Sequence, residues 1–113
     1  MVTIYHNPRC SKSREALQLL EEHGKAFTTL KYITEPLTKE QLTGIITKLG
    51  IKPIDLVRKN EAVWKENYKG KQLADNEVID ALLLYPKLIE RPIVVNGSKA
   101  VVARPAEKIK DLL

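Results

Sequence analysis

The order of hydrophobic and polar residues predicts short strands and helices that follow one another closely. Val2 to Tyr5 is β-branched and aromatic, which favours a strand, and Pro8 breaks the extended run soon after it. From Ser11 to His23 the apolar residues recur at helical spacing, and Gly24 stands where a left-handed residue would end that helix. Phe27 to Ile33 again has strand composition. A strand, a helix and a second strand imply a parallel pair joined by a right-handed crossover.

The middle of the chain reads as helical. Thr38 and Gln41 have the spacing of a capping box, ahead of a helix that Gly50 closes. Further helical segments are expected at Pro53 to Val57, at Glu61 to Tyr68, and at Asn76 to Tyr85 with Asp75 as its N-cap. We therefore expect an all-helical insertion over approximately residues 38–88.

The end of the chain predicts a hairpin and a last helix. Ile93 to Val95 and Ala100 to Val102 are apolar runs that flank Asn96-Gly97, a strong two-residue hairpin signal. Pro105 to Leu113 reads as a helix with proline in its first turn. The hairpin adds an antiparallel pair to the parallel one. The predicted class is α/β, with a mixed four-stranded sheet flanked by helices and the insertion between its βαβ and ββα halves.

Composition narrows the class of protein. The chain has 113 residues, 43% of them hydrophobic and 29% charged, and these values suit one globular domain over residues 1–113 rather than a disordered chain or a large barrel. The net charge of +5 favours anionic partners. No apolar run is long enough to cross a membrane, and the start of the chain does not resemble a signal peptide. A single cysteine, Cys10, forms no internal disulfide, so we expect a protein of the reducing cytoplasm.

Cys10 is the main candidate for chemistry. It lies in the loop between the first strand and the first helix, where free N–H groups and the helix dipole favour a thiolate. Arg9, Lys12, Arg14 and His6 are the nearby cations or potential cations. The alternative is a small buried apolar residue, which is what a lone cysteine often is.

The residues around Cys10 also limit the reaction. The motif Cys10-Ser11-Lys12-Ser13 holds no second cysteine, so a covalent intermediate on Cys10 needs an outside thiol for its release, and a glutathione-dependent cycle fits. Ser13 is a candidate hydrogen-bond donor to the thiolate or to a bound oxyanion, or else an ordinary first-turn residue.

Three arginines are candidate oxyanion ligands. Arg91 and Arg104 each precede a proline, which restricts their backbones to extended geometry, and Arg58 follows an apolar turn. A planar guanidinium suits a tetrahedral oxyanion, although each of the three could be a solvated surface charge. The basic stretch around Trp64 and Tyr68 is better explained as a solvated helix face than as a nucleic-acid site. With two histidines and one cysteine, the chain offers no metal-ligand cluster.

The chain resembles the arsenate reductases that are coupled to glutathione and glutaredoxin. The resemblance runs in order over nearly the whole chain. It is carried by Ile4-Tyr5-His6-Asn7-Pro8-Arg9-Cys10-Ser11-Lys12-Ser13-Arg14, by Leu56-Val57-Arg58-Lys59-Asn60, and by Ile89-Glu90-Arg91-Pro92-Ile93-Val94-Val95 together with Ala103-Arg104-Pro105. Two features depart from the best-known members, which carry a longer tail and have small neutral residues where this chain has Ser11-Lys12.

The resemblance implies a thioredoxin-like fold and a specific set of roles. Cys10 would be the nucleophile, with His6 tuning the thiol environment and Ser13 and Arg14 in supporting positions. The implied oxyanion site consists of Arg58, Arg91 and Arg104, and the implied cis proline is Pro92.

The implied reaction reduces arsenate to arsenite. The Cys10 thiolate attacks arsenic and water leaves; glutathione then attacks the adduct, and glutaredoxin completes a two-electron reduction. Glutathione would be a co-substrate, with no tightly bound cofactor and no metal. We also expect a monomer that binds neither nucleic acid nor a membrane.

Other functions on the same fold stay open at this stage. One is a glutathione-dependent thiol reductase with a different substrate. Another is a transcription regulator that binds RNA polymerase, although such regulators often carry a Cys-x-x-Cys switch and Ser13 replaces its second cysteine here. The last is an interaction module with an inert Cys10.

Overall fold

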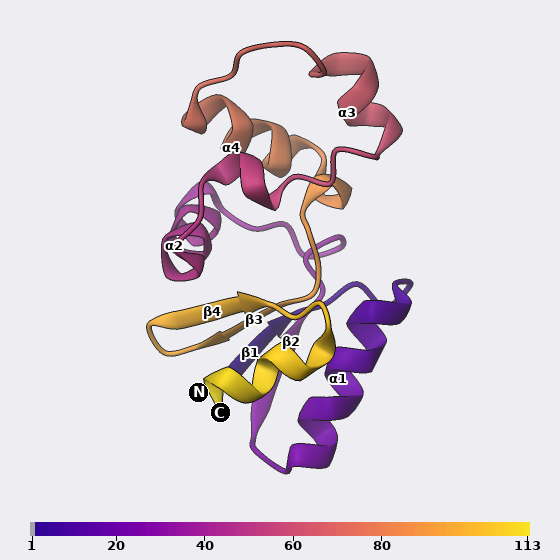
Figure 1. Cartoon of the computed structure of the whole chain (residues 1–113), viewed down its shortest axis with the longest axis vertical. Helices are drawn as coiled ribbons and strands as arrows, with labels where there is room; N and C mark the ends of the chain where they lie inside the picture. The colour runs from indigo at the N-terminus through magenta and orange to yellow at the C-terminus, as the bar shows by residue number, and fades with distance from the viewer. Residues whose placement is uncertain (1) are drawn as a thin grey trace. The chain divides into compact units, whose positions relative to one another are not determined.

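The computed structural model describes residues 2–113 and divides the chain into two compact units. The first unit holds the chain up to Glu35 and again from Arg91 to the end, and the second unit is Pro36–Glu90. Figure 1 shows the first unit as a small sheet with two helices and the second as a group of helices.

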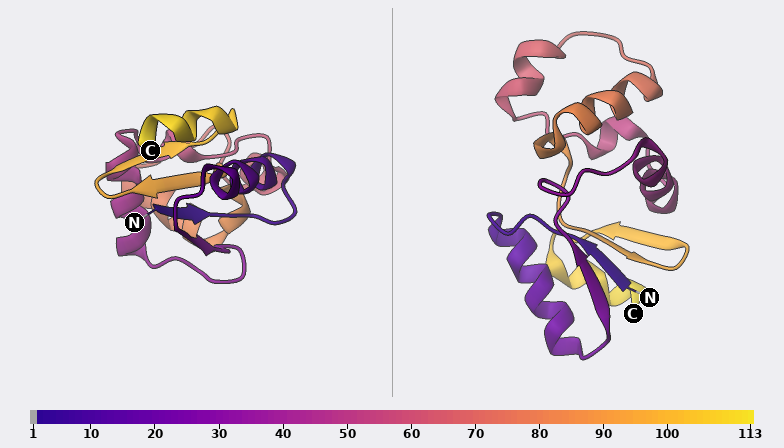
Figure 2. Two further views of the ribbon diagram at one scale, coloured as in Figure 1. Left: turned by 90° about the horizontal axis from the view of Figure 1, so that it is seen from below. Right: turned by 180° about the vertical axis from the view of Figure 1, so that it is seen from behind.

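The sheet of the first unit is mixed. Its strands are β1 (Val2–Tyr5), β2 (Phe27–Leu30), β3 (Ile93–Asn96) and β4 (Lys99–Val102), in the order β2-β1-β3-β4. β1 pairs with β2 in parallel, whereas β1 with β3 and β3 with β4 are antiparallel (Figure 2). This arrangement, with a helical insertion between the βαβ and ββα halves, confirms the predicted thioredoxin-like fold.

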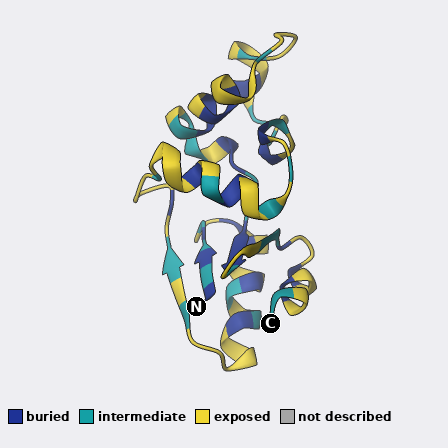
Figure 3. Cartoon of the chain, turned by 90° about the vertical axis from the view of Figure 1, so that its left-hand side faces the viewer, coloured by how far each residue is buried: buried dark blue, intermediate teal, exposed yellow. Residues whose placement is uncertain are grey.

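Two helices of the first unit share one core with the sheet. They are α1 (Ser11–His23) and the 3₁₀ helix η3 (Ala106–Leu112), which pack side by side (Figures 1 and 2). The core combines inward residues of β1, β3, α1 and the C-terminal segment, namely Val2, Ile4, Ala16, Leu20, Val94, Ala103, Ala106 and Ile109. Burial of these apolar side chains holds the strand ends, and therefore the loops after them, in place (Figure 3).

The second unit is helical throughout. Its elements are α2 (Lys39–Leu49), η1 (Pro53–Leu56), α3 (Ala62–Asn67), α4 (Asp75–Leu84) and η2 (Pro86–Leu88). The predicted capping box of α2 is confirmed, since the Thr38 hydroxyl accepts from the Gln41 N–H at 3.1 Å while the Gln41 side chain accepts from the Thr38 N–H at 2.8 Å. Leu42, Ile45, Leu56, Trp64, Val78, Leu82 and Leu88 are among its buried residues.

The second strand is shorter than the sequence predicts. The strand ends at Leu30, the partner of Tyr5 in β1. His6, the residue after β1, donates its N–H to the Leu30 carbonyl at 2.8 Å. Beyond that point β1 has given way to the loop that contains Pro8, so the parallel ladder with β1 does not continue into residues 31–33. They turn instead, and the Glu35 N–H bonds the Lys31 carbonyl at 2.8 Å.

Three local boundaries also differ from expectation. Asp75 is the first residue of α4, and Ala74 is its N-cap. The Ala74 N–H donates to the Glu77 carboxylate at 2.9 Å. Asn96 pairs with Lys99, so the hairpin loop is Gly97-Ser98, with only Gly97 (φ 63°) in the left-handed region. The last helix is a 3₁₀ helix, and its two buried residues, Ala106 and Ile109, are three positions apart, which matches three residues per turn.

Candidate functional site

The loop after β1 places Cys10 at the N-terminus of α1. Cys10 is the N-cap residue, with extended backbone angles (φ −95°, ψ 124°), and its carbonyl accepts the Arg14 N–H at 3.0 Å. Its own N–H donates to the Asn7 carbonyl at 3.0 Å. The thiol therefore lies beside the free N–H groups of the first helical turn, which carry partial positive charge.

Local hydrogen bonds give the loop its shape. The Asn7 side-chain oxygen accepts from the Arg9 N–H at 3.1 Å, an Asx turn that suits the residue before a proline. Arg14 reaches back from α1, and its Nη1 donates to the Pro8 carbonyl at 2.9 Å. Arg14 thus ties the loop to the helix.

The thiol of Cys10 is held toward its ionised form. Cys10 is 9% exposed, and this burial by itself raises the pKa of the thiol. Hydrogen bonds from the Ser13 and Lys12 backbone N–H groups, together with the charge and a hydrogen bond of the Arg91 guanidinium, outweigh burial and bring the pKa below its ordinary value. This balance differs from that of an inert core cysteine, in which burial acts alone.

Alkylation of Cys10 is expected to respond to pH accordingly. Because the thiolate is the nucleophile, the rate of reaction with iodoacetamide should reach half its plateau at a lower pH in the folded protein than in the same chain unfolded in urea. The unfolded chain is the matched control, since it carries the same thiol without the N–H groups and Arg91. Equal midpoints in the two states would show that the fold leaves the thiol unperturbed.

Sheet register brings Arg91 to the same end of the sheet as the Cys10 loop. β1 and β3 are antiparallel with Tyr5 opposite Ile93, so the residues after β1 lie beside the residues before β3. The Nε and Nη1 atoms of Arg91 are buried, and neither has a hydrogen-bond partner among the described residues. A buried guanidinium N–H without a partner is costly, and here two of them accompany a thiolate-favouring cysteine.

Arg104 lies across the hairpin from Arg91. Ile93 pairs with Val102, and the Ala103 N–H donates to the Pro92 carbonyl at 2.9 Å, which continues the ladder toward the two arginines. Arg104 is exposed. The Arg91–Pro92 peptide bond is cis, as the family resemblance implies, and the Arg104–Pro105 bond is also cis.

His6 and Ser13 form a buried polar pair beside the loop. His6 is 4% exposed and Ser13 is fully buried, and the His6 Nδ1 and Ser13 Oγ atoms are 2.6 Å apart. The Ser13 hydroxyl oxygen also accepts the Asn7 N–H at 3.0 Å. The hydroxyl is thus engaged with the loop, and it is the backbone N–H of Ser13 that stabilises the thiolate.

The surroundings of His6 favour the neutral imidazole. Burial lowers the pKa of His6, and the charges of Lys31 and Arg14 lower it further, while the contact with Ser13 opposes them. His6 is therefore a hydrogen-bonding partner at neutral pH rather than one of the cations of the site.

This lowered pKa predicts a pH-dependent stability. A group whose pKa is lower in the folded state contributes stability that is complete above its unfolded value, 6.5, and is lost as the pH falls toward the folded value. We expect the free energy of urea unfolding to fall below pH 6.5 with a slope of up to about 1.4 kcal/mol per pH unit. His6→Asn should flatten that slope between pH 7 and 5. An unchanged slope would place the titrating group elsewhere.

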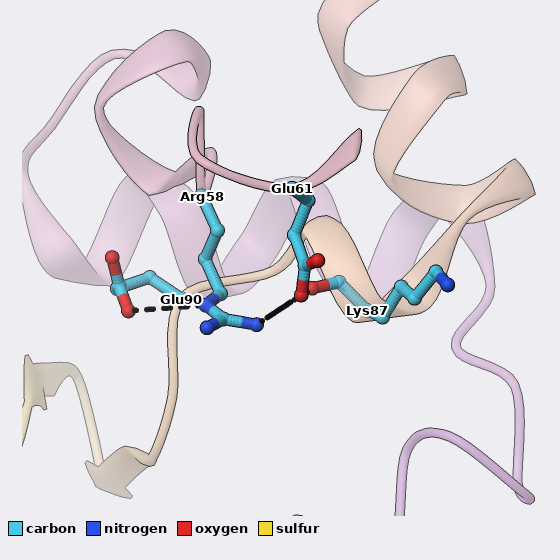
Figure 4. Close-up of polar contacts among 4 residues, drawn as sticks. All are labelled: Arg58, Glu61, Lys87 and Glu90. Carbon is cyan, nitrogen blue, oxygen red and sulfur yellow. Dashed lines mark hydrogen bonds and ion pairs between the residues drawn. The ribbon is translucent and has the colours of Figure 1, made fainter. Parts of the chain in front are cut away.

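Arg58 lies in the second unit and is held by two carboxylates. It follows η1, and its Nη1 atom is 2.6 Å from an oxygen of Glu61 and 3.4 Å from the Lys87 carbonyl. Its Nε atom is 3.9 Å from an oxygen of Glu90 (Figure 4). The structure therefore brings His6, Cys10, Ser13, Arg14 and Arg91 together in the first unit. It places Arg104 across the hairpin from Arg91 and gives Arg58 polar surroundings of its own. The sequence does not single out Glu61 or Glu90; the three-residue spacing from Arg58 to Glu61 is the only signal.

Two other kinds of site find no support in the described residues. Residues 2–113 hold no group of three or more histidine, cysteine, aspartate or glutamate side chains arranged to bind a metal ion. Within that same range no helix has the length and apolar character needed to span a bilayer.

Comparisons with known proteins identify the family of this chain and several of its relatives. The ArsC family model matches residues 5–112. An arsenate reductase of Neisseria meningitidis serogroup A is 41% identical over 99% of this chain and 97% of its own length, and the uncharacterized protein YfgD of Escherichia coli K12 is 40% identical over 99% and 96%. The solved arsenate reductase of Vibrio cholerae superposes with a TM-score of 0.94 at 42% identity, over 99% of this chain and 97% of that one.

Other relatives are longer than this chain. It covers 80% of an Escherichia coli arsenate reductase to which it is 35% identical. The match of the family model extends from the end of β1 to η3 and so includes every candidate site residue. The chain is a member of the ArsC family.

Proposed function

We propose that this chain is an arsenate reductase in which Cys10 is the nucleophile. The observation that carries the proposal is the pairing of a thiol held toward its ionised form with the Arg91 guanidinium. Two of its buried nitrogen atoms, Nε and Nη1, have no hydrogen-bond partner within residues 2–113. A tetrahedral oxyanion supplies acceptors for such groups, and arsenic within bonding reach of a thiolate is open to attack. The relatives named as arsenate reductases support the choice of oxyanion.

Each residue of the first unit has a defined part in this proposal. The N–H groups of Lys12 and Ser13 and the guanidinium of Arg91 stabilise negative charge at the sulfur and at the bound oxyanion. Arg104, opposite Arg91 on the hairpin, supplies a second guanidinium. The polar contacts of His6 and Arg14 hold the loop in shape. We include Arg58 as an oxyanion ligand because the resemblance to the family implies that role.

The proposed reaction balances with two external thiols. The Cys10 thiolate attacks As(V), a sulfur–arsenic bond forms, and a protonated oxygen leaves as water. Glutathione displaces a second oxygen as water. A glutaredoxin thiolate then attacks the glutathione sulfur; the electron pair of that sulfur–arsenic bond passes to arsenic, which becomes As(III), and a mixed disulfide leaves. Water hydrolyses the remaining bond, releasing arsenite and the Cys10 thiol. The missing second cysteine requires such outside thiols.

The proposed setting follows from these partners. Glutathione and glutaredoxin are reducing partners of the cytoplasm, so we place the reaction there. Substrates are arsenate and glutathione, and no bound cofactor is needed because the electrons come from thiols. One copy of the chain carries all the residues named, which suits a monomer.

A coupled assay tests the proposal directly. Arsenate-dependent oxidation of NADPH is expected when glutathione, glutaredoxin and glutathione reductase are supplied, with turnover lost when any one of them is left out. Arsenate-independent turnover of a glutathione mixed disulfide, without arsenite formation, would instead favour a thiol reductase with another substrate. No turnover in either assay would reject both enzymes.

A further inference from the structure

Two carboxylates lie against the Arg58 guanidinium at different distances: Glu61 is close to Nη1, and Glu90 is farther from Nε. Arg58, Glu61 and Glu90 have side chains that are 25%, 28% and 29% exposed, respectively, so their charges are partly shielded from water. These three side chains carry one positive and two negative charges, and both carboxylates compete with an oxyanion for the N–H groups of the guanidinium.

The backbone fixes Arg58 and Glu90 as neighbours. The Arg58 N–H donates to the Leu88 carbonyl at 2.7 Å, and the Glu90 N–H donates to the Leu56 carbonyl at 2.8 Å, on either side of an antiparallel bridge between Val57 and Ile89. In such a ladder Arg58 and Glu90 occupy diagonal positions on one face, within reach of long side chains. Their proximity is thus a property of the backbone pairing.

The two ion pairs differ in strength and in the atoms they use. Glu61 is 2.6 Å from Nη1, the distance of a strong charge-assisted hydrogen bond, and Nη1 also faces the Lys87 carbonyl at 3.4 Å. Glu90 is 3.9 Å from Nε, which is an ion pair without a hydrogen bond. Figure 4 shows the guanidinium between the two carboxylates.

This geometry decides which edge of the guanidinium an oxyanion can use. A guanidinium offers two bidentate edges, Nη1 with Nη2 and Nε with Nη2. Glu61 engages Nη1, one of the two nitrogen atoms of the first edge, with a short bond, whereas Glu90 lies beside Nε of the second edge at 3.9 Å. An oxyanion that seeks a two-point contact therefore exchanges with Glu90 far more readily than with Glu61.

We propose that Glu61 is a positioning residue that anchors Arg58, and that Glu90 is a specificity-determining competitor that an oxyanion must displace from the Nε–Nη2 edge. This inference rests on the proposed function, because it takes Arg58 as an oxyanion ligand. Glu90 therefore determines how much negative charge an anion must carry in order to displace it and bind Arg58. Weakly charged anions leave the Arg58–Glu90 ion pair intact, whereas a divalent tetrahedral anion breaks it and takes the place of Glu90.

Equilibrium binding of arsenate tests both roles. Calorimetric titration of arsenate into full-length protein carrying Cys10→Ser isolates binding from reduction. In that background Glu90→Gln is expected to tighten the dissociation constant about two- to fivefold, and Glu61→Gln to weaken it about three- to tenfold. Opposite signs for two identical charge changes separate these roles from a general effect of charge. Glu66→Gln, an exposed glutamate of α3 in the same unit, is the matched control and should change binding less than either.

Arg58→Ala separates failure of this inference from failure of the proposed function. It should weaken arsenate binding and remove the gain from Glu90→Gln in the double variant. No arsenate binding in the Cys10→Ser background, or binding that Arg58→Ala does not change, overturns the inference together with the role proposed for Arg58. Weaker binding in Arg58→Ala with no gain from Glu90→Gln, or with a gain that survives in the double variant, overturns the inference alone. Thermal unfolding of each variant verifies that it is folded.

Discussion

Replacement of Cys10 by serine is expected to lower arsenate-dependent turnover by at least about a thousandfold. A hydroxyl at this position is far less ionised than the thiol, and it cannot form the sulfur–arsenic bond through which electrons later pass to arsenic. The fold should survive, because serine is nearly isosteric and the backbone bonds of Cys10 with Asn7 and Arg14 do not involve the side chain. The measurement is the NADPH-coupled assay together with thermal unfolding.

Ser11→Ala is the matched control for this substitution. Ser11 is the exposed neighbour of Cys10 at the start of α1, and its replacement should leave turnover close to that of the parent. If the Cys10→Ser protein is folded yet retains substantial turnover, Cys10 has no place in the mechanism. Loss of turnover in both variants would show instead that any substitution at the N-terminus of α1 disturbs the site.

Replacement of Arg91 by alanine is expected to have the second largest effect. It should change both the kcat/KM for arsenate and the pH midpoint of Cys10 alkylation. Loss of a charge-assisted hydrogen bond to a bound oxyanion should lower kcat/KM for arsenate about ten- to a hundredfold, mainly through KM. The same substitution removes a charge and a hydrogen bond that lower the pKa of the Cys10 thiol. The alkylation midpoint should therefore move to higher pH in the Arg91→Ala protein.

Two control variants show why the guanidinium is needed. Arg91→Lys keeps the positive charge but loses the planar fork, so it should restore more of the alkylation midpoint than of the affinity for arsenate. Arg9→Ala removes an exposed arginine of the same loop and should change both quantities much less. Unchanged kinetics and an unchanged midpoint in Arg91→Ala would make Arg91 an ordinary structural residue.

The balance at Cys10 explains why both effects should be large. Burial opposes ionisation of the thiol, so the thiolate depends on a few directed contacts rather than on solvent. A buried site of low dielectric strengthens each of those contacts and makes the loss of any one costly. The same reasoning applies to Arg91, because its buried Nε and Nη1 atoms have no hydrogen-bond partner among the residues that the structure describes.

Much of the local structure could be predicted from the sequence. The first strand and α1 occupy the predicted residues, Gly24 has the left-handed conformation (φ 82°) that ends a helix, and Thr38 with Gln41 forms the expected capping box. These features depend on residues only a few positions apart. Side-chain shape and hydrogen bonding within one turn decide them, whatever the rest of the chain does.

Elements whose extent depends on a distant partner were harder to predict. Phe27 to Ile33 has strand composition throughout, but the strand ends at Leu30 because β1 offers no further residue to pair with. The hairpin loop is displaced by one residue, to Gly97-Ser98, because pairing of Asn96 with Lys99 completes the ladder. Composition alone carries no information about where a neighbouring strand stops.

The candidate site divides in the same way. The position of Cys10 between a strand and a helix, the absence of a second cysteine and the Arg-Pro pairs are all visible in the sequence and point to a thiol beside an anion site. Only the tertiary structure decided that the Ser13 hydroxyl bonds His6 and Asn7, and that Glu61 and Glu90 flank Arg58. It also decided that two buried nitrogen atoms of Arg91 find no hydrogen-bond partner in the described part of the chain. The physical reason is that hydrogen-bond partners, burial and ion pairs depend on which segments meet when the sheet and the helices pack. Chain-local chemistry determines what a residue can do, and packing determines what it contacts.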